Sequence, residues 1–240
     1  MSAVRTEASA ARRARIARLG GLYAVTPDIG DTALLTRKIA AAIAGGAAAL
    51  QYRNKLADIV LRRDQARAIA RRQARDRACL PARARTLFIV NDDAALAAAV
   101  EADGVHIGAD DADIATARAL VGTDRIVGVS CYGDIERANA AVEAGADYVA
   151  FGSFFASATK PAAQRADIGV LRRARLLGVP VVAIGGITAS NASLLIDAGA
   201  AAVAVISDVF ASDDPAAITR AAAAIGRIFA AEPSHQSRSG

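Results

Sequence analysis

A strict alternation of short apolar runs with longer, alanine-rich segments constrains this 240-residue chain more than any other feature. Apolar strands that alternate with helices are typical of a parallel sheet covered by those helices. We therefore expect eight buried strands. They are Leu22–Val25, Ala47–Leu50, Leu87–Val90, Gly104–Ile107, Ile126–Val129, Tyr148–Phe151, Val181–Ile184 and Ala202–Ile206.

Segments with helical periodicity separate these runs and follow the last of them. They predict helices at residues 32–44, 57–77, 93–102, 112–121, 134–144, 168–177, 189–198 and 214–230. Eight strand–helix units in this length predict an α/β fold, a single-domain (β/α)8 TIM barrel over residues 21–230. A doubly wound open sheet is the alternative, but the first strand leads into Thr26-Pro27-Asp28 instead of the glycine-rich fingerprint of that fold.

The two ends of the chain differ in composition from the barrel. Residues 1–20 are expected to form a basic N-terminal extension, partly helical between Ala11 and Leu19, and residues 231–240 a flexible tail. The longest nearly uninterrupted apolar run, residues 39–50, is shorter than the roughly 20 residues that cross a bilayer. No apolar signal stretch follows the N-terminal arginines, and Cys79 and Cys131 lack CxxC spacing. We expect a cytoplasmic protein with reduced thiols and no membrane partner.

Positive charge is concentrated in the first third of the chain. Residues 1–85 hold 18 Lys and Arg against 6 Asp and Glu, whereas the remainder holds 11 against 18. Such a surface is one feature of nucleic-acid-binding proteins. However, Arg63, Arg67, Arg71 and Arg75 recur every fourth residue, which indicates the solvent-facing side of one helix. Only four Tyr and six Phe are present, which disfavours stacking on single-stranded nucleic acid.

Polar residues follow seven of the eight predicted strands. Because function in a (β/α)8 barrel lies at the carboxyl ends of the strands, these residues predict one shared site. The segments are Gln51-Tyr52-Arg53-Asn54-Lys55, Asn91-Asp92-Asp93, Gly108-Ala109-Asp110-Asp111, Ser130, residues 152–160, Gly185-Gly186-Ile187-Thr188 and Ser207-Asp208.

Two features of this rim point to phosphate. Gly185 and Gly186, with a helix expected after Thr188, suit a cradle of backbone N–H groups, although a tight turn also needs glycine. Lysine is rare, at 3 residues against 26 Arg, and Lys55 and Lys160 both lie in polar clusters after apolar runs. These two lysines are therefore predicted to be point charges for phosphate.

Asp92 and Asp111 follow neighbouring strands and offer hard oxygen ligands of the kind that suit Mg²⁺. Either residue could instead cap the next helix, and Asp93 and Asp110 are the expected caps or surface groups. Two carboxylates and Mg²⁺ sum to zero charge, which leaves the cationic residues Arg53, Lys55 and Lys160 to balance a diphosphate and a second phosphate.

No nucleophile with a paired base is evident. His235 lies in the tail, His106 is expected to be a barrel-interior histidine, and Ser130 has no evident histidine partner. Acyl-enzyme chemistry is therefore disfavoured. We expect a reaction that needs electrostatic help with a leaving group more than proton transfer.

The ordered set of motifs resembles the thiamine-phosphate synthase family over roughly residues 21–230. The matching segments are Gln51–Lys55, Val90-Asn91-Asp92, Gly104–Gly108 followed by Asp110-Asp111, Gly128-Val129-Ser130, Thr159-Lys160, Ile184–Ile187 and Ile206-Ser207. The resemblance implies a TIM barrel that joins 4-amino-2-methyl-5-(diphosphomethyl)pyrimidine to 4-methyl-5-(2-phosphoethyl)thiazole with Mg²⁺, giving thiamine phosphate and pyrophosphate. It also implies attack by the lone pair of the thiazole nitrogen, which needs no general base.

The resemblance also implies roles for individual residues, with Lys160, Arg53 and Ser130 as the catalytic ones. The pyrimidine diphosphate would be held by the Gln51-Tyr52-Arg53-Asn54-Lys55 segment, Asn91, Ser130 and Lys160. Mg²⁺ would be held by Asp92 and Asp111. The thiazole phosphate would be held by Ser157, Ala158, Thr159 and the backbone of Gly186, Ile206 and Ser207.

This chain departs from the family pattern in two loops. Ala156 stands where the family usually has Pro and is followed by Ser157 where Thr is frequent, and Ala109 stands where Gln is frequent. A loop without that proline is expected to be more mobile, which affects loop closure and turnover more than substrate identity.

Two other functions compete with this interpretation. A thiazole tautomerase on the same scaffold would lack a diphosphate site, and the presence of Arg53, Lys55, Asp92, Asp111 and Lys160 argues against it. A non-catalytic nucleic-acid-binding protein would use the basic N-terminal third. We expect small-molecule partners and no nucleic acid, and the sequence leaves a homo-oligomer open.

Overall fold

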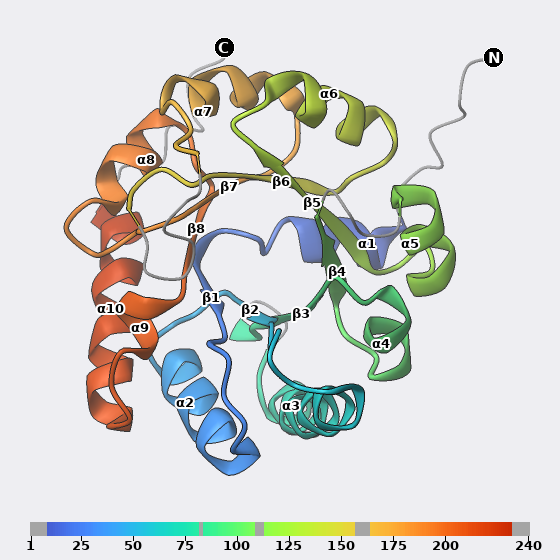
Figure 1. Ribbon diagram of the computed structural model, residues 1–240, viewed down its shortest axis with the longest axis vertical. Coiled ribbons are helices and arrows are strands. Elements are labelled where there is room, and N and C mark those ends of the chain that lie inside the picture. The colour runs from blue at the N-terminus through green and yellow to red at the C-terminus, as the bar shows by residue number, and fades with distance from the viewer. Residues whose placement is uncertain (1–8, 82–83, 109–112, 157–163, 232–240) are drawn as a thin grey trace.

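Eight parallel strands close into a barrel in the computed structural model, which describes residues 9–81, 84–108, 113–156 and 164–231 (Figure 1). The strand order follows the sequence, and the last strand pairs with the first, with Leu22 opposite Val203. Helices surround the barrel (Figure 1). The predicted single-domain (β/α)8 fold is confirmed, and the open sheet is excluded.

The element bounds lie close to those that the sequence predicts. The strands are β1 (Gly21–Val25), β2 (Ala49–Tyr52), β3 (Leu87–Asn91), β4 (Gly104–Ile107), β5 (Ile126–Tyr132), β6 (Tyr148–Phe151), β7 (Val181–Ile184) and β8 (Ala202–Val205). The α-helices are α1 (Ala10–Ile16), α2 (Thr32–Ala44), α3 (Ile59–Cys79), α4 (Ala94–Ala99), α5 (Ile114–Val121), α6 (Ile135–Glu143), α7 (Gly169–Ala174), α8 (Ala192–Ala198), α9 (Ser207–Phe210) and α10 (Pro215–Ala231).

Three bounds differ in ways that affect the site. Strand β2 lies two residues later than predicted, so Gln51 and Tyr52 are in the strand, and β5 continues past Ser130 to Tyr132. Helix α8 begins at Ala192 instead of directly after Thr188. The four-residue helix α9 was not predicted, because one turn is too short to show a helical period.

Aspartates begin six of the helices. The side chains of Asp31, Asp58, Asp93, Asp113, Asp134 and Asp214 accept hydrogen bonds from backbone N–H groups in the first turns of α2, α3, α4, α5, α6 and α10. A carboxylate at this position satisfies N–H groups that have no partner within the helix. These caps explain why the helices start directly after the rim loops.

The inside of the barrel is filled by side chains, including the rings of Tyr23 and Tyr148. Tyr148 is completely buried and lies against Gly128 of β5. A Cβ atom at Gly128 would lie only 1.9 Å from Cζ of Tyr148. The barrel therefore needs glycine at this position for the tyrosine ring to fit.

Replacing Gly128 by alanine is expected to lower the free energy of unfolding by about 3 kcal/mol, because overpacking displaces a fixed ring. Gly226 in α10 is the matched control, since a Cβ there meets nothing within 4 Å. Alanine at Gly226 should stabilise the helix slightly. Urea denaturation measures both variants, and an unchanged midpoint for Gly128→Ala would contradict the packing argument.

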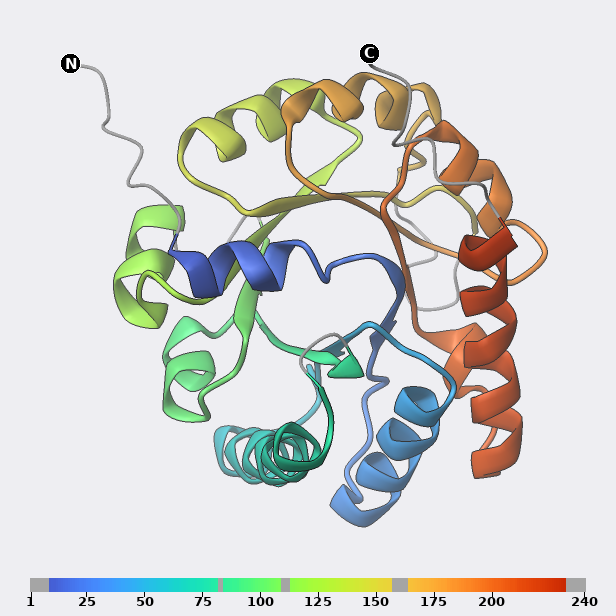
Figure 2. The ribbon, with the colours of Figure 1, turned by 180° about the vertical axis from the view of Figure 1, so that it is seen from behind.

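Helix α1 crosses the end of the barrel opposite the strand carboxyl ends (Figure 2). Its Ile16 packs with Leu19 against the barrel-interior cluster. Arg15 Nε lies 3.0 Å from Asp103 Oδ1, and Arg12 Nε lies 3.0 Å from Asp147 Oδ1. Both carboxylates are buried. Part of the N-terminal positive charge thus neutralises acidic groups at the base of the barrel.

The arginines that recur every fourth residue in α3 face solvent, as their spacing predicts. Arg63, Arg67, Arg71 and Arg75 are all exposed along α3. Among the residues that the structure describes, no helix is long and apolar enough to cross a membrane.

Candidate active site

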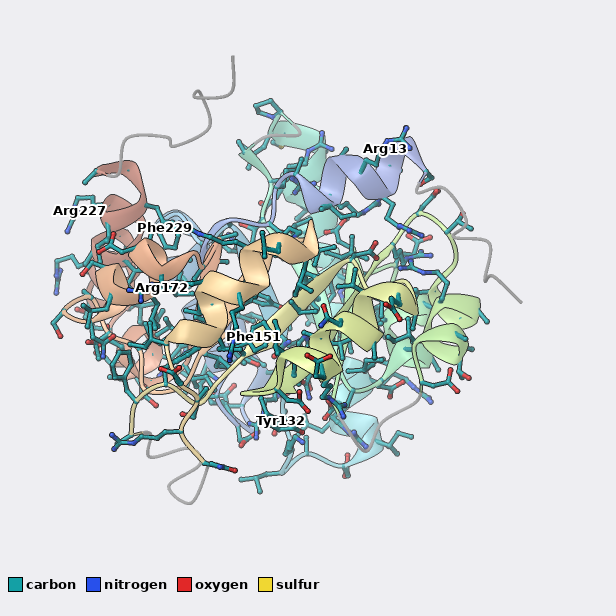
Figure 3. All side chains as sticks on the ribbon, turned by 90° about the horizontal axis from the view of Figure 1, so that it is seen from above. Arg13, Tyr132, Phe151, Arg172, Arg227 and Phe229 are labelled. Carbon is teal, nitrogen blue, oxygen red and sulfur yellow. The ribbon has the colours of Figure 1, made fainter. Side chains whose placement is uncertain are left out.

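A cavity of about 1320 Å³ opens at the carboxyl ends of the strands. Every strand contributes to its wall, as the convergence of the predicted strand ends requires. From β1 to β8 the lining includes Val25, Gln51, Asn91, His106, Ser130, Ala150, Ile184 and Ala204, with Ser207 beside the last strand. Figure 3 shows Tyr132, at the end of β5, and Arg13, on α1, at opposite ends of the molecule.

The segment that begins in β2 divides between the cavity and the outer layer. Gln51, Arg53 and Lys55 line the cavity, whereas Tyr52 and Asn54 do not. Successive side chains of an extended segment point to opposite sides, which explains this alternation. Of the predicted binding segment, only every second residue therefore lines the cavity.

Tyr52 and Asn54 instead bind Gln65 of α3. The Tyr52 hydroxyl donates to Gln65 Oε1 at 2.9 Å, and Asn54 Nδ2 donates to the same oxygen at 3.0 Å. All three side chains are buried. These contacts fix the rim loop to the helix layer and keep the side chains of Tyr52 and Asn54 away from the cavity.

Asp28 organises the two cationic residues of this segment, a role that the sequence did not indicate. Its Oδ2 lies 3.1 Å from a guanidinium nitrogen of Arg53, and its Oδ1 accepts from the backbone N–H of Lys55 at 2.7 Å. Thr26 adds a reciprocal pair of bonds to the Arg53 backbone. The one sequence feature that could have pointed to Asp28 is its position in Thr26-Pro27-Asp28, the polar segment that follows β1 directly.

Asp92 lies on the cavity wall and pairs with Lys55, whose Nζ is 3.2 Å from Asp92 Oδ2. Its backbone has φ 64°, in the left-handed region, and its N–H donates to the carbonyl of His106 at 2.8 Å. The next residue, Asp93, caps α4 by accepting from Leu96 N–H at 2.8 Å. The structure thus separates a cavity carboxylate from the expected cap.

The Gly185-Gly186 turn after β7 needs glycine for two reasons. The φ angles are 107° and 62°, which disfavour other residues. A Cβ atom would lie 2.0 Å from Ser153 Oγ at Gly185 and 2.2 Å from the Ala156 carbonyl oxygen at Gly186. This turn and the Ile206-Ser207 segment both line the cavity, so backbone groups from β7 and β8 adjoin one space.

The expectation that Ser130 lacks a histidine partner is wrong. Ser130 Oγ lies 2.9 Å from His106 Nε2, and His106 Nδ1 lies 3.0 Å from the hydroxyl of Tyr148. His106 is 8% exposed, so its predicted position inside the barrel is correct. The pair was missed because it depends on the register of β4 and β5, in which His106 is opposite Gly128.

Arg137 of α6 is a further rim residue that the sequence did not indicate, and it is cationic. It lines the cavity, and its Nε donates to the Ser130 carbonyl at 2.9 Å. Its guanidinium carbon lies 5.7 Å from the centre of the Tyr132 ring. Arg137 therefore adds positive charge on the same side of the cavity as Ser130.

Several predicted site residues lie outside the described residues. They are Asp111, Ser157, Ala158, Thr159 and Lys160, and Ala109, one of the departures from the family pattern, lies outside them too.

Arginine and lysine side chains, a carboxylate and a glycine turn at the carboxyl rim define the class of this protein: it is a (β/α)8-barrel enzyme whose rim cavity has the groups that suit phosphate. Within that class, the chain belongs to the thiamine monophosphate synthase family, whose model matches residues 22–209. It is thus a transferase of that family, as the sequence motifs predicted.

Individual relatives agree with this assignment. Thiamine-phosphate synthase of Thiobacillus denitrificans is 52% identical over 215 residues, which cover 89% of this chain and 97% of the relative. The enzyme of the same name from Azoarcus sp. is 53% identical over 199 residues, covering 82% and 93%. The solved thiamine phosphate pyrophosphorylase from Pyrococcus furiosus superposes with a TM-score of 0.71 at 31% identity, covering 90% of this chain and 96% of its own.

Proposed function

We propose that this chain joins 4-amino-2-methyl-5-(diphosphomethyl)pyrimidine to 4-methyl-5-(2-phosphoethyl)thiazole, forming thiamine phosphate and releasing pyrophosphate. The observation that carries the proposal is the convergence of Arg53, Lys55 and Asp92 with the Gly185-Gly186 turn around one cavity. That cavity offers cations for a diphosphate and a glycine turn for a second phosphate. The relatives named above support the same reaction.

In this reaction a C–N bond replaces a C–O bond. The thiazole nitrogen supplies an electron pair to the pyrimidine methylene carbon, and the bonding pair of the C–O bond leaves with pyrophosphate. Arg53, oriented by Asp28, and Lys55 would balance the charge that develops on the diphosphate. Ser130 and Arg137 would contact it from the opposite wall, so the chain's task is charge stabilisation instead of proton removal.

We infer that Asp92 contributes to a magnesium site together with Asp111, which lies outside the described residues. Among the residues that the structure describes, no three His, Cys, Asp or Glu side chains cluster as a metal site. Mg²⁺ in phosphate-transfer sites commonly uses only one or two carboxylates, with water and substrate oxygens as its other ligands, so the accessible Asp92 carboxylate fits such an ion. A bound Mg²⁺ would neutralise negative charge on the diphosphate.

Lys55 and Mg²⁺ are expected to compete for Asp92, because the ammonium group already lies 3.2 Å from its carboxylate. Replacing Lys55 by methionine should therefore strengthen Mg²⁺ binding to the substrate-free protein, by roughly 1.5-fold to fivefold for a half-exposed pair. Isothermal titration with Mg²⁺ alone measures this change. The same variant should bind the pyrimidine diphosphate more weakly, and a loss of Mg²⁺ affinity would contradict the competition.

Binding of the pyrimidine diphosphate separates this function from that of a thiazole tautomerase. A tautomerase needs no site for this molecule, whereas a synthase does. Isothermal titration in Mg²⁺ buffer should show one bound pyrimidine diphosphate per chain, with affinity lost in Arg53→Ala. Binding of the thiazole phosphate alone would overturn the proposal. We place the reaction in the cytoplasm, where the free thiols of Cys79 and Cys131 would stay reduced.

A further inference from the structure

Five side chains form a continuous row of hydrogen bonds through the inside of the barrel. Gln51 Nε2 donates to the Tyr23 hydroxyl at 3.2 Å, and the hydroxyls of Tyr23 and Tyr148 are 2.9 Å apart. The Tyr148 hydroxyl is 3.0 Å from His106 Nδ1, and His106 Nε2 is 2.9 Å from Ser130 Oγ. The two ends of this row, Gln51 and Ser130, both line the cavity.

In the structure the Gln51 amide faces Tyr23 with Nε2, and this orientation sets the direction of the row. Because Nε2 can only donate, Tyr23 accepts there and has one proton left to donate. If Tyr23 donates to Tyr148, then Tyr148 donates to His106 Nδ1, and the Nε2–H of His106 donates to Ser130. Both tyrosine protons then have an acceptor, and among the residues that the structure describes no acceptor takes the proton of Ser130, which remains for a ligand.

The opposite direction leaves a buried proton without an acceptor. If Ser130 donated to His106 and His106 to Tyr148, then Tyr148 would donate to Tyr23. The Tyr23 oxygen would accept hydrogen bonds from both Tyr148 and Gln51, and the Tyr23 proton would have no acceptor among the described residues. Tyr23 is 2% exposed, so this arrangement is unfavourable. Burial also raises the pKa of the Tyr23 and Tyr148 hydroxyls well above the ordinary value, so both keep their protons at neutral pH.

We propose that Tyr23, Tyr148 and His106 are positioning residues that fix Ser130 as a hydrogen-bond donor into the cavity, with His106 as the neutral Nε2–H tautomer. The acceptor would be an oxygen of the departing diphosphate, and in this respect the inference rests on the proposed function. At the other end, the same row fixes Gln51 with Oε1 as an acceptor for a donor group of the substrate. One network inside the barrel thereby determines that Ser130 offers a hydrogen-bond donor to the cavity and that Gln51 offers an acceptor.

The tautomer can be measured without any substrate. The chain has only two histidines, so in a ¹⁵N-labelled His235→Gln protein all imidazole signals come from His106. Long-range ¹H–¹⁵N correlation at neutral pH should show Nε2 protonated and Nδ1 unprotonated. A protonated Nδ1, alone or with Nε2, would overturn the proposal. This result does not depend on synthase activity, so it separates a failure of this inference from a failure of the proposed function.

A double-mutant cycle tests whether Tyr148 acts through Ser130. Tyr148→Phe removes only the hydroxyl and should lower kcat about tenfold, whereas Ser130→Ala should lower it by roughly 10²-fold, as for the loss of one positioned donor. In kcat the double variant should be no slower than Ser130→Ala, because the row then has no serine hydroxyl to orient. If the kcat loss of the double variant were instead the product of the two single losses, Tyr148 would have a merely structural role, and the inference would be contradicted. If Tyr148→Phe does not fold, Tyr23→Phe completes the same cycle, and the tautomer measurement stands by itself.

Discussion

Replacing Asp92 by asparagine is expected to lower kcat by roughly 10²-fold or more and to remove the stimulation by Mg²⁺. The change removes the charge of a cavity carboxylate that pairs with Lys55. Asparagine is the right substitute because the backbone at this position has φ 64°, which asparagine tolerates better than alanine. Steady-state kinetics over a range of Mg²⁺ concentrations measures both effects.

The neighbouring Asp93 supplies a matched control. It differs from Asp92 in pointing to the first turn of α4, where its carboxylate caps the helix. Asparagine caps a helix about as well as aspartate, so Asp93→Asn should keep both stability and Mg²⁺ dependence. In the unmodified protein EDTA should stop turnover and Mg²⁺ restore it. Full activity of Asp92→Asn, or of the protein in metal-free buffer, would refute the metal assignment.

Replacing Lys160 by alanine is the second change with a large expected effect, also a loss of roughly 10²-fold or more in kcat. Lys160 is one of only three lysines in an arginine-rich chain and follows the loop after β6. We propose that its ammonium group acts on the departing diphosphate, so the KM for the thiazole phosphate should change much less.

Arginine at Lys160 should restore only part of the rate, because a planar guanidinium does not reproduce a compact ammonium in a confined site. The separate changes in kcat and in KM distinguish two roles. If Lys160→Ala left kcat intact and raised only KM, Lys160 would bind substrate and transition state equally. The leaving-group role would then be refuted.

The barrel could be predicted from the sequence because its strands are apolar runs whose pattern does not depend on their neighbours. Val181–Ile184 and Gly104–Ile107 appear in the structure with the bounds that the sequence predicts. The cavity could be predicted because parallel strands bring their carboxyl ends to one rim. Gln51, Asp92 and Ser207 are far apart in the chain and line the same space for this reason.

What the sequence could not supply were facts that depend on register and on side-chain direction. The His106–Ser130 contact requires the pairing of β4 with β5, which no local pattern encodes. The separation of Tyr52 and Asn54 from the cavity follows from strand alternation, but only once β2 is known to extend to Tyr52. Asp28 acts through Arg53, a contact between two loops that follow different strands.

Phosphorus NMR of the complete reaction tests the central claim most directly. The purified protein is mixed with the pyrimidine diphosphate, the thiazole phosphate and Mg²⁺, and the phosphorus signals are followed with time. We expect pyrophosphate and thiamine phosphate to appear in a one-to-one ratio, with neither formed when the thiazole phosphate is omitted. No thiamine phosphate in the complete mixture, or pyrophosphate released without it, would contradict the account.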